Sequence, residues 1–147
     1  MATDSVVSDN AEPMTLEWDD LRAAGHRRRL LPAAIQLFLQ VADRWGLTVE
    51  QRRTLLGDIS KPTYHNWQKG KVAVLSRDQL ERISLVLGIY KGLKLLFSDT
   101  AGALRWLKSP NRDLPFAGGS PLDRLLCGGI DDLYVVRRYL DAWREVK

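Results

Sequence analysis

The stretch Leu47–Gly70, LTVEQRRTLLGDISKPTYHNWQKG, decides the fold of this chain of 147 residues. Its T-x-x-Q start at Thr48 predicts a capping box that opens a helix, and Gly57 predicts the end of that helix. Ser60, with a proline two positions later, predicts a second helix start, and Gly70 predicts its end. The stretch therefore predicts two short helices joined by a tight turn.

Helical patterns continue on both sides of this stretch. Upstream, Pro32 suits a first turn, and apolar residues then recur every three or four positions as far as Trp45. Downstream, an S-x-x-Q box at Ser76 opens a helix that is predicted to reach Gly88. Residues 89–97 have a second helical pattern.

The remainder of the chain also favours short helices. One is expected at about Ala101–Leu107, a turn-rich loop follows at 108–119, and Ser120 caps the next helix. Thr15–Gly25 is a further short candidate near the N-terminus. The last helix opens at Asp131. Its apolar stripe is Leu133, Val136, Leu140 and Trp143. With no alternating strand pattern, the predicted fold class is all-α, with about six to eight helices.

Charge is unevenly distributed along the chain. Residues 1–20 carry −6, residues 21–71 carry +7 and residues 72–147 carry +3, while 45% of all residues are hydrophobic. That hydrophobic content predicts a packed core, whereas residues 1–14 are expected to be a disordered acidic tail. The basic block indicates a polyanionic partner. Arg27–Arg29 could contact phosphates, pair with the acidic tail or be an ordinary solvated face.

Several classes of site lack support in the sequence. The single Cys127 excludes an intramolecular disulfide and a multi-cysteine metal site, and its apolar neighbours predict a buried side chain. His26 and His65 have no partner ligands at metal spacing. No local catalytic motif is present, so neither catalysis nor a cofactor is expected. Without an apolar run of membrane-spanning length or a signal peptide, the protein is expected to be soluble and cytoplasmic.

Two short helices in a basic bundle form the helix-turn-helix layout, in which the second helix enters the major groove of DNA. Tyr64 and Trp67 lie on one face of that helix, where core packing is favoured over base stacking. On the other face, Asn66 can pair with adenine and Lys61 can donate to guanine. The predicted DNA-binding residues are Lys61, Thr63, His65, Asn66, Lys69 and Lys71. The alternative for each is a solvated helix face.

The sequence from Leu47 to Gly70 resembles the Cro/repressor (Xre-type) helix-turn-helix family. It departs from the family in the turn Gly57–Ser60, which is longer than usual. It also carries Arg52 and Arg53 where the family often has apolar or small residues. Both departures concern the angle at which the recognition helix is held.

The second half resembles the antitoxins of the Xre/MbcA/ParS family, which are partners of RES-domain toxins. The resemblance covers roughly residues 35–145. It rests on the fragments Leu75–Leu93, Trp106–Asn111, Gly118–Leu126 and Asp132–Trp143. It implies an antitoxin of a type II toxin–antitoxin module. Its C-terminal domain would cover the active site of an NAD-consuming toxin, while the helix-turn-helix half would dimerise and repress the shared operon.

The C-terminal part also supplies candidate toxin-binding residues. Arg and Trp are frequent anchors of interfaces, and a positive helix end would suit a cleft built for the pyrophosphate of NAD. The predicted residues, each expected to project outward, are Arg124, Arg137, Arg138, Asp141, Arg144 and Lys147. The residues alone leave a basic solvated helix as the alternative, and the resemblance favours a toxin interface.

These expectations divide the chain into three parts. Residues 1–29 form an acidic tail with a short helix, residues 30–97 a DNA-binding domain and residues 98–147 a toxin-binding domain. The expected partners are a RES-domain toxin, operator DNA with an inverted repeat and a second copy of the chain, with no membrane. The alternative is a plain Cro-like repressor whose C-terminal half only dimerises or senses a ligand.

Overall fold

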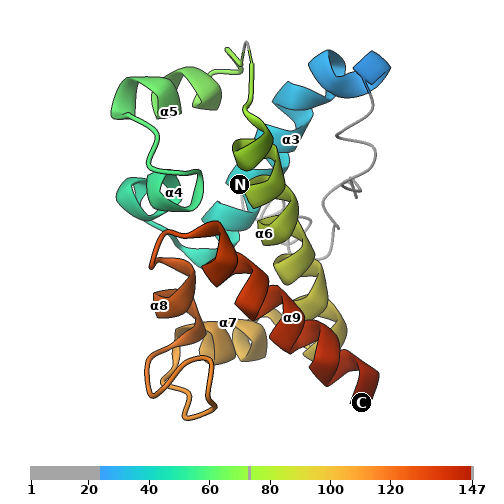
Figure 1. The fold of residues 1–147 in the computed structure, drawn as a ribbon, viewed down its shortest axis with the longest axis vertical. Coiled ribbons are helices and arrows are strands. Elements are labelled where there is room, and N and C mark those ends of the chain that lie inside the picture. Colours follow the sequence, from blue (N-terminus) through green and yellow to red (C-terminus); the bar gives the residue numbers. More distant parts are fainter. Residues whose placement is uncertain (1–23, 73, 147) are drawn as a thin grey trace, which may run out of the picture.

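The computed structural model describes residues 24–72 and 74–146, with side chains described from residue 32 onward. All regular structure within this part is helical, which confirms the predicted all-α class (Figure 1). The helices are α3 (Ala24–Trp45), α4 (Val49–Leu55), α5 (Lys61–Gln68), α6 (Arg77–Leu96), α7 (Thr100–Lys108), α8 (Pro121–Leu125) and α9 (Ile130–Val146).

The predicted caps organise these helices. Thr48 Oγ1 accepts a hydrogen bond from the Gln51 amide, and the Gln51 side chain accepts one from the Thr48 amide, so the capping box before α4 is confirmed. Ser60 caps α5 in the predicted place. The turn between the two helices contains consecutive positive φ angles, 93° at Gly57 and 60° at Asp58. This left-handed pair accommodates the longer turn.

Two predicted helix boundaries are wrong. Pro32 lies inside α3, which begins at Ala24. The intervening residues are mostly good helix formers, so the helix extends back past the one missing amide hydrogen bond. Gly88 does not end a helix either, because α6 runs unbroken from Arg77 to Leu96. The guanidinium of Arg137 occupies the space where a Cβ of Gly88 would stand, so the glycine serves helix packing here.

One hydrophobic core runs through the described part of the molecule. It includes Phe38 of α3, Tyr64 of α5, Ile83 of α6 and Leu140 of α9, each at most 1% exposed. α6 lies at its centre, with α3 against it and α9 in the most extensive helix–helix contact of the fold. Figure 1 shows α5 at the upper end of the molecule with α4 below it, and α7 and α8 in the lower half.

Some sequence expectations lie outside the described residues. They include the acidic tail at residues 1–14 and the helix proposed to begin at Thr15. They also include the side chains of Arg27–Arg29 and of His26, and the whole of Lys147.

Candidate functional site

One face of α5 is built into the core. Tyr64 and Trp67 are 1% and 5% exposed, which confirms that both pack inward. The phenol oxygen of Tyr64 also accepts a hydrogen bond of 3.2 Å from Arg52 Nη1. The orientation of α5 is therefore fixed by two buried aromatic side chains, and its opposite face is directed to solvent.

That opposite face gathers the predicted DNA-binding residues. Lys61, His65 and Lys69 are spaced four residues apart along α5 and its C-cap, so they follow one line on the helix surface. Asn66 is next to this line, and Lys71 follows just beyond the helix. Lys61, His65, Asn66, Lys69 and Lys71 are exposed. Thr63 is partly buried, and its hydroxyl oxygen accepts a hydrogen bond of 3.0 Å from Ser60 Oγ.

Arg52 and Arg53, where the chain departs from the helix-turn-helix pattern, hold α4 against its neighbours. Besides its contact with Tyr64, Arg52 donates from Nε to the Leu47 carbonyl at 3.0 Å and pairs with Asp43 at 2.9 Å. Arg53 donates from Nε to the carbonyl of Ile59, in the turn, at 2.7 Å. Hydrogen bonds from these cations replace the apolar contacts expected at these positions.

Arg82 is a third structural arginine, and it was not predicted from the sequence. It is 8% exposed, and its Nε donates to Asp78 Oδ2 at 2.7 Å. Its Nη atoms reach the carbonyl of Leu55, at the end of α4, at 3.4 Å and the carbonyl of Gly128, before α9, at 2.9 Å. One side chain thus joins the helix-turn-helix to the segment that leads into the last helix. The only sequence signal for this role of Arg82 is its position four residues after Asp78, in the helix that the S-x-x-Q box at Ser76 opens.

Helix α9 presents its predicted apolar stripe to the core. Leu133, Val136 and Leu140 are fully buried, and Trp143 is partly buried. Arg138 is exposed, with its guanidinium carbon 5.1 Å from the centroid of the Tyr134 ring.

Two of the arginines expected to project outward are held within the molecule. Arg124 is only partly exposed, because it pairs with Asp132 at 2.7 Å and donates to the Pro115 carbonyl at 2.8 Å. Arg137 lies across α6 at Gly88, with its Nε 3.3 Å from Asp141 Oδ2 but not aligned for a hydrogen bond.

Further along α9, Arg144 is exposed and pairs with Asp141 at 3.4 Å. Lys147 lies outside the described residues. The structure therefore brings Arg138, Asp141 and Arg144 together on the outer side of α9, while Arg124 and Arg137 are partly occupied elsewhere.

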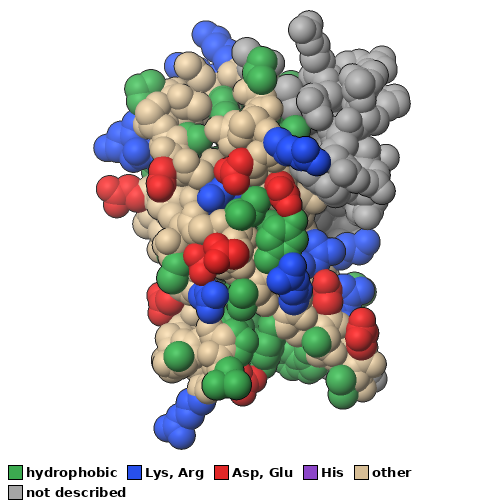
Figure 2. Space-filling model, viewed as in Figure 1, with side chains coloured by type: hydrophobic (Ala, Val, Ile, Leu, Met, Phe, Trp, Pro, Cys, Tyr) green, Lys and Arg blue, Asp and Glu red, His purple; other side chains and the backbone are tan. Residues whose placement is uncertain are grey.

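Five rings form an aromatic cluster between α6, α7, α9 and the loop before α8. Its members are Phe97, Trp106, Phe116, Tyr139 and Trp143, with centroid separations of 5.0 to 6.4 Å between contacting rings. The Tyr139 hydroxyl donates to the carboxylate of Asp113. Burial, this hydrogen bond and the charge of Asp113 together raise the pKa of Tyr139. Figure 2 shows hydrophobic side chains gathered at this end of the molecule.

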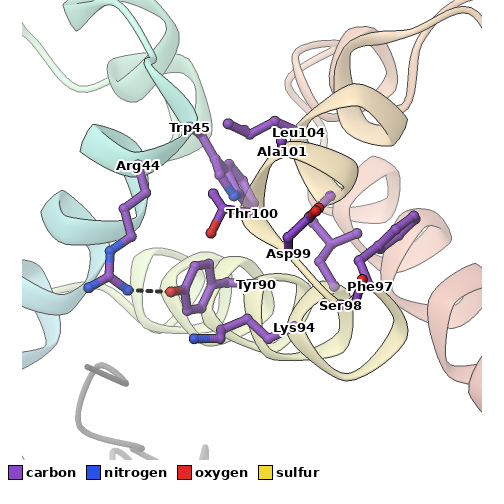
Figure 3. A pocket seen from close by; sticks show the side chains of 12 residues that line it. Arg44, Trp45, Tyr90, Lys94, Phe97, Ser98, Asp99, Thr100, Ala101 and Leu104 are labelled. Carbon is purple, nitrogen blue, oxygen red and sulfur yellow. Dashed lines mark hydrogen bonds between the residues drawn. The ribbon is translucent and has the colours of Figure 1, made fainter. Parts of the chain in front are cut away.

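A groove of about 500 Å³ lies beside the cluster, between α3, α6 and α7 (Figure 3). Arg44 and Lys94 line it together with Tyr90, whose hydroxyl accepts a hydrogen bond from Arg44. Phe97 lines the groove and also belongs to the aromatic cluster.

Three further observations bear on other kinds of site. No group of three potential metal ligands occurs among the described residues. No helix in the described part is long and apolar enough to cross a membrane. The prediction that Cys127 is buried is wrong: it is exposed, because it lies in the turn that follows the short helix α8, outside the apolar face of that helix.

Comparison with known families identifies two regions of this chain. Residues 23–88 match the family model of the antitoxin Xre-like helix-turn-helix domain, and residues 93–145 match that of the antitoxin Xre/MbcA/ParS C-terminal toxin-binding domain. This chain belongs to the Xre-type antitoxins. The chain is also 40% identical over 114 residues to "Uncharacterized protein y4oB" of Sinorhizobium fredii, an alignment that covers 78% of this chain and 86% of that protein. In this antitoxin the first matched region ends and the second begins inside α6.

Proposed function

We propose that this antitoxin has two functions. It neutralises a RES-domain toxin that degrades NAD, and the antitoxin also represses its own operon. Its C-terminal half would occlude the active site of the toxin in the cytoplasm. Its helix-turn-helix half would bind an inverted-repeat operator as a homodimer, and neither half would catalyse a reaction. The observation that carries the proposal is the presence of both family regions in one chain, each with an exposed polar face.

The DNA half of the proposal rests on α5. Lys61 could donate to guanine and Asn66 could pair with adenine through its amide, and both are exposed on the helix that helix-turn-helix proteins place in the major groove. Lys69 and Lys71 are suited to phosphates. Thr63 and His65 complete the proposed contact set.

A double substitution tests this surface. Lys61→Ala with Asn66→Ala should weaken operator binding at least about thirtyfold, since each base contact contributes about 1–3 kcal/mol. Thermal stability should be unchanged, because both side chains are exposed. Lys108→Ala, which removes an exposed lysine from α7, is the matched control. Normal operator binding by the double variant would mean that α5 does not read the bases.

Salt provides a second measurement on the same complex. Several phosphate contacts should make the operator affinity of the wild-type protein fall steeply as salt rises, because each contact releases a counterion. Lys69→Ala should reduce that slope by about one unit without changing sequence preference. An affinity independent of salt would contradict phosphate binding by this face.

The toxin half of the proposal rests on the outer face of α9. Arg138, Asp141 and Arg144 are grouped there, and arginine is a frequent interface anchor. Arg124 and Arg137 stay in the proposed set because 29% and 35% of their side chains remain exposed. Lys147 completes it.

Co-expression tests the neutralisation directly. The antitoxin would be produced together with the RES-domain protein encoded beside its gene, and cellular NAD and growth would be measured. We expect restored NAD and a complex that co-purifies. Continued NAD loss in the presence of folded antitoxin would reject the toxin proposal. A plain repressor whose C-terminal half only dimerises or senses a ligand would then be the better account.

A further inference from the structure

Aromatic side chains are distributed unequally between the two halves of this antitoxin. In the described residues before α6, every aromatic side chain other than His65 is buried: Phe38, Trp45, Tyr64 and Trp67. Within the region matched to the toxin-binding domain, four rings of the aromatic cluster remain partly exposed: Phe97, Trp106, Tyr139 and Trp143. Large rings in contact with solvent are therefore concentrated in the half that matches a toxin-binding domain family.

Apolar residues extend this surface in two directions. Tyr139, Trp143 and Val146 follow spacings of four and three residues on α9, so they occupy one stripe, and Val146 is 87% exposed. On the other side, Leu114 is 94% exposed and adjoins Asp113, the residue that accepts the Tyr139 hydrogen bond. We call Leu114, Val146 and the four partly exposed rings the aromatic face.

Packing of the monomer accounts for only part of this arrangement. The rings contact one another, and Phe116 closes the cluster from inside at 6% exposed. Leu114 and Val146, however, have almost no burial within the chain, so the fold does not require apolar side chains there. An apolar patch bordered by charged residues is typical of a protein-binding surface.

The charges around the aromatic face indicate what kind of surface covers it. Charged residues of both signs adjoin the aromatic face along the chain: Arg105 precedes Trp106, Arg144 and Glu145 follow Trp143, and Asp113 precedes Leu114. A complementary partner surface would be apolar at its centre and would carry charges of both signs at its edge.

We propose that the aromatic face is where the toxin docks on this antitoxin, through an apolar patch edged by charged side chains. The inference rests on the proposed function and names its surface, with Trp143 and Tyr139 as central anchors. It places the toxin at the end of the molecule remote from α5, so the same chain can hold DNA and toxin at once (Figure 1).

The test places charge at the two exposed edges of the face. Leu114→Asp with Val146→Asp should weaken binding of the adjacent-gene RES-domain toxin at least about tenfold, because two carboxylates would be buried against an apolar surface. The measurement is titration calorimetry on the full-length antitoxin. The matched control is Val74→Asp, which changes a residue that is 78% exposed and lies between α5 and α6.

Each outcome has a distinct meaning. The double variant should keep wild-type operator affinity and melting temperature, since neither side chain is packed. Wild-type toxin affinity in this variant would overturn the inference, as would an equal loss with Val74→Asp. A variant that loses only self-association would show that a second copy occupies the face, which also overturns it. If the wild-type antitoxin itself fails to bind the toxin, the proposed function fails, and this is seen before any substitution is made.

Discussion

Single arginines have structural roles in this antitoxin that their charge alone does not reveal. Arg82 satisfies the carbonyls of Leu55 and Gly128 from a site that is 8% exposed. Arg82→Met would fill much of the volume of the arginine side chain but has no N–H donors. The two carbonyls would then lose their hydrogen bonds to this side chain. We expect the free energy of unfolding to fall by about 2–4 kcal/mol, measured by urea denaturation.

A substitution of its partner separates the two parts of that effect. Asp78→Asn keeps an acceptor oxygen, and Asp78 is 51% exposed, so loss of its charge should lower the stability by less than about 1 kcal/mol. If both variants lose the same stability, the surface ion pair, and not the bonds to the carbonyls, is what Arg82 provides.

Two tyrosines should lose their phenol protons at unusually high pH, because burial and hydrogen bonds to carboxylates raise their pKa values. The pKa of Tyr134 is raised above 10.0 mainly by its hydrogen bond to Glu81, then by burial. That of Tyr139 is raised mainly by burial, then by its hydrogen bond to Asp113. A raised pKa in the folded state means that the protonated form is stabilised by folding. This contribution is fully present below pH 10 and is lost as pH rises through the folded-state values.

Absorbance titration of the phenolates measures this directly. We expect Tyr139→Phe to remove one late-titrating phenol, and Asp113→Asn to lower the pKa of Tyr139 toward its ordinary value. An Asp113→Asn protein with an unchanged alkaline titration would show that the carboxylate does not act on Tyr139.

The site residues show why sequence reasoning succeeds unevenly at this scale. Tyr64 and Trp67 were predicted as core because helical spacing alone separates their face from that of Asn66. Arg124 was predicted to be exposed, yet its partners, Asp132 and the Pro115 carbonyl, lie in other segments of the chain. Local spacing carries no information about such contacts.

The sequence predicted where several helices start, but it did not predict the role of a glycine inside a helix. Thr48, Ser60 and Ser76 cap helices as predicted, because capping uses residues within three positions of each other. Gly88 was misread as a helix end, since its role depends on Arg137 from α9. Where a glycine is required by a neighbouring element, the sequence does not distinguish it from a helix terminator.

The contact between α6 and α9 provides a prediction about elements. A Cβ at the buried Gly92 would lie 3.6 Å from Leu140 Cβ, which is ordinary contact. Gly92→Ala should therefore raise the free energy of unfolding by about 0.5–1 kcal/mol through helix propensity. At Gly88 a Cβ would overlap the Arg137 guanidinium, so Gly88→Ala should raise the free energy of unfolding by less than Gly92→Ala does. Thermal and urea denaturation measure both, and a destabilised Gly92→Ala would mean that α6 and α9 pack too closely for any side chain there.

At the scale of the whole molecule, the two family regions share one core. α6 contributes to both, and Arg82 connects α4 to the segment before α9. Removing residues 140–147 would delete the fully buried Leu140 as well as the end of α9. Loss of toxin binding in such a truncation would therefore reflect lost packing as much as a lost interface, and this favours surface substitutions for mapping.

A shared core also predicts a single unfolding transition. Trp45 and Trp67 lie in the DNA-binding half, and Trp106 and Trp143 in the toxin-binding half, so fluorine NMR of fluorotryptophan-labelled protein follows both halves separately. Because the core from Phe38 to Leu140 is continuous, the signals of these four of the five tryptophans should lose intensity at the same urea concentration, coincident with the loss of helical circular dichroism. Trp143 unfolding at a clearly lower urea concentration than Trp45 would contradict this. The toxin-binding half would then be a separate cooperative unit, and Arg82 would be a contact between two domains instead of part of one.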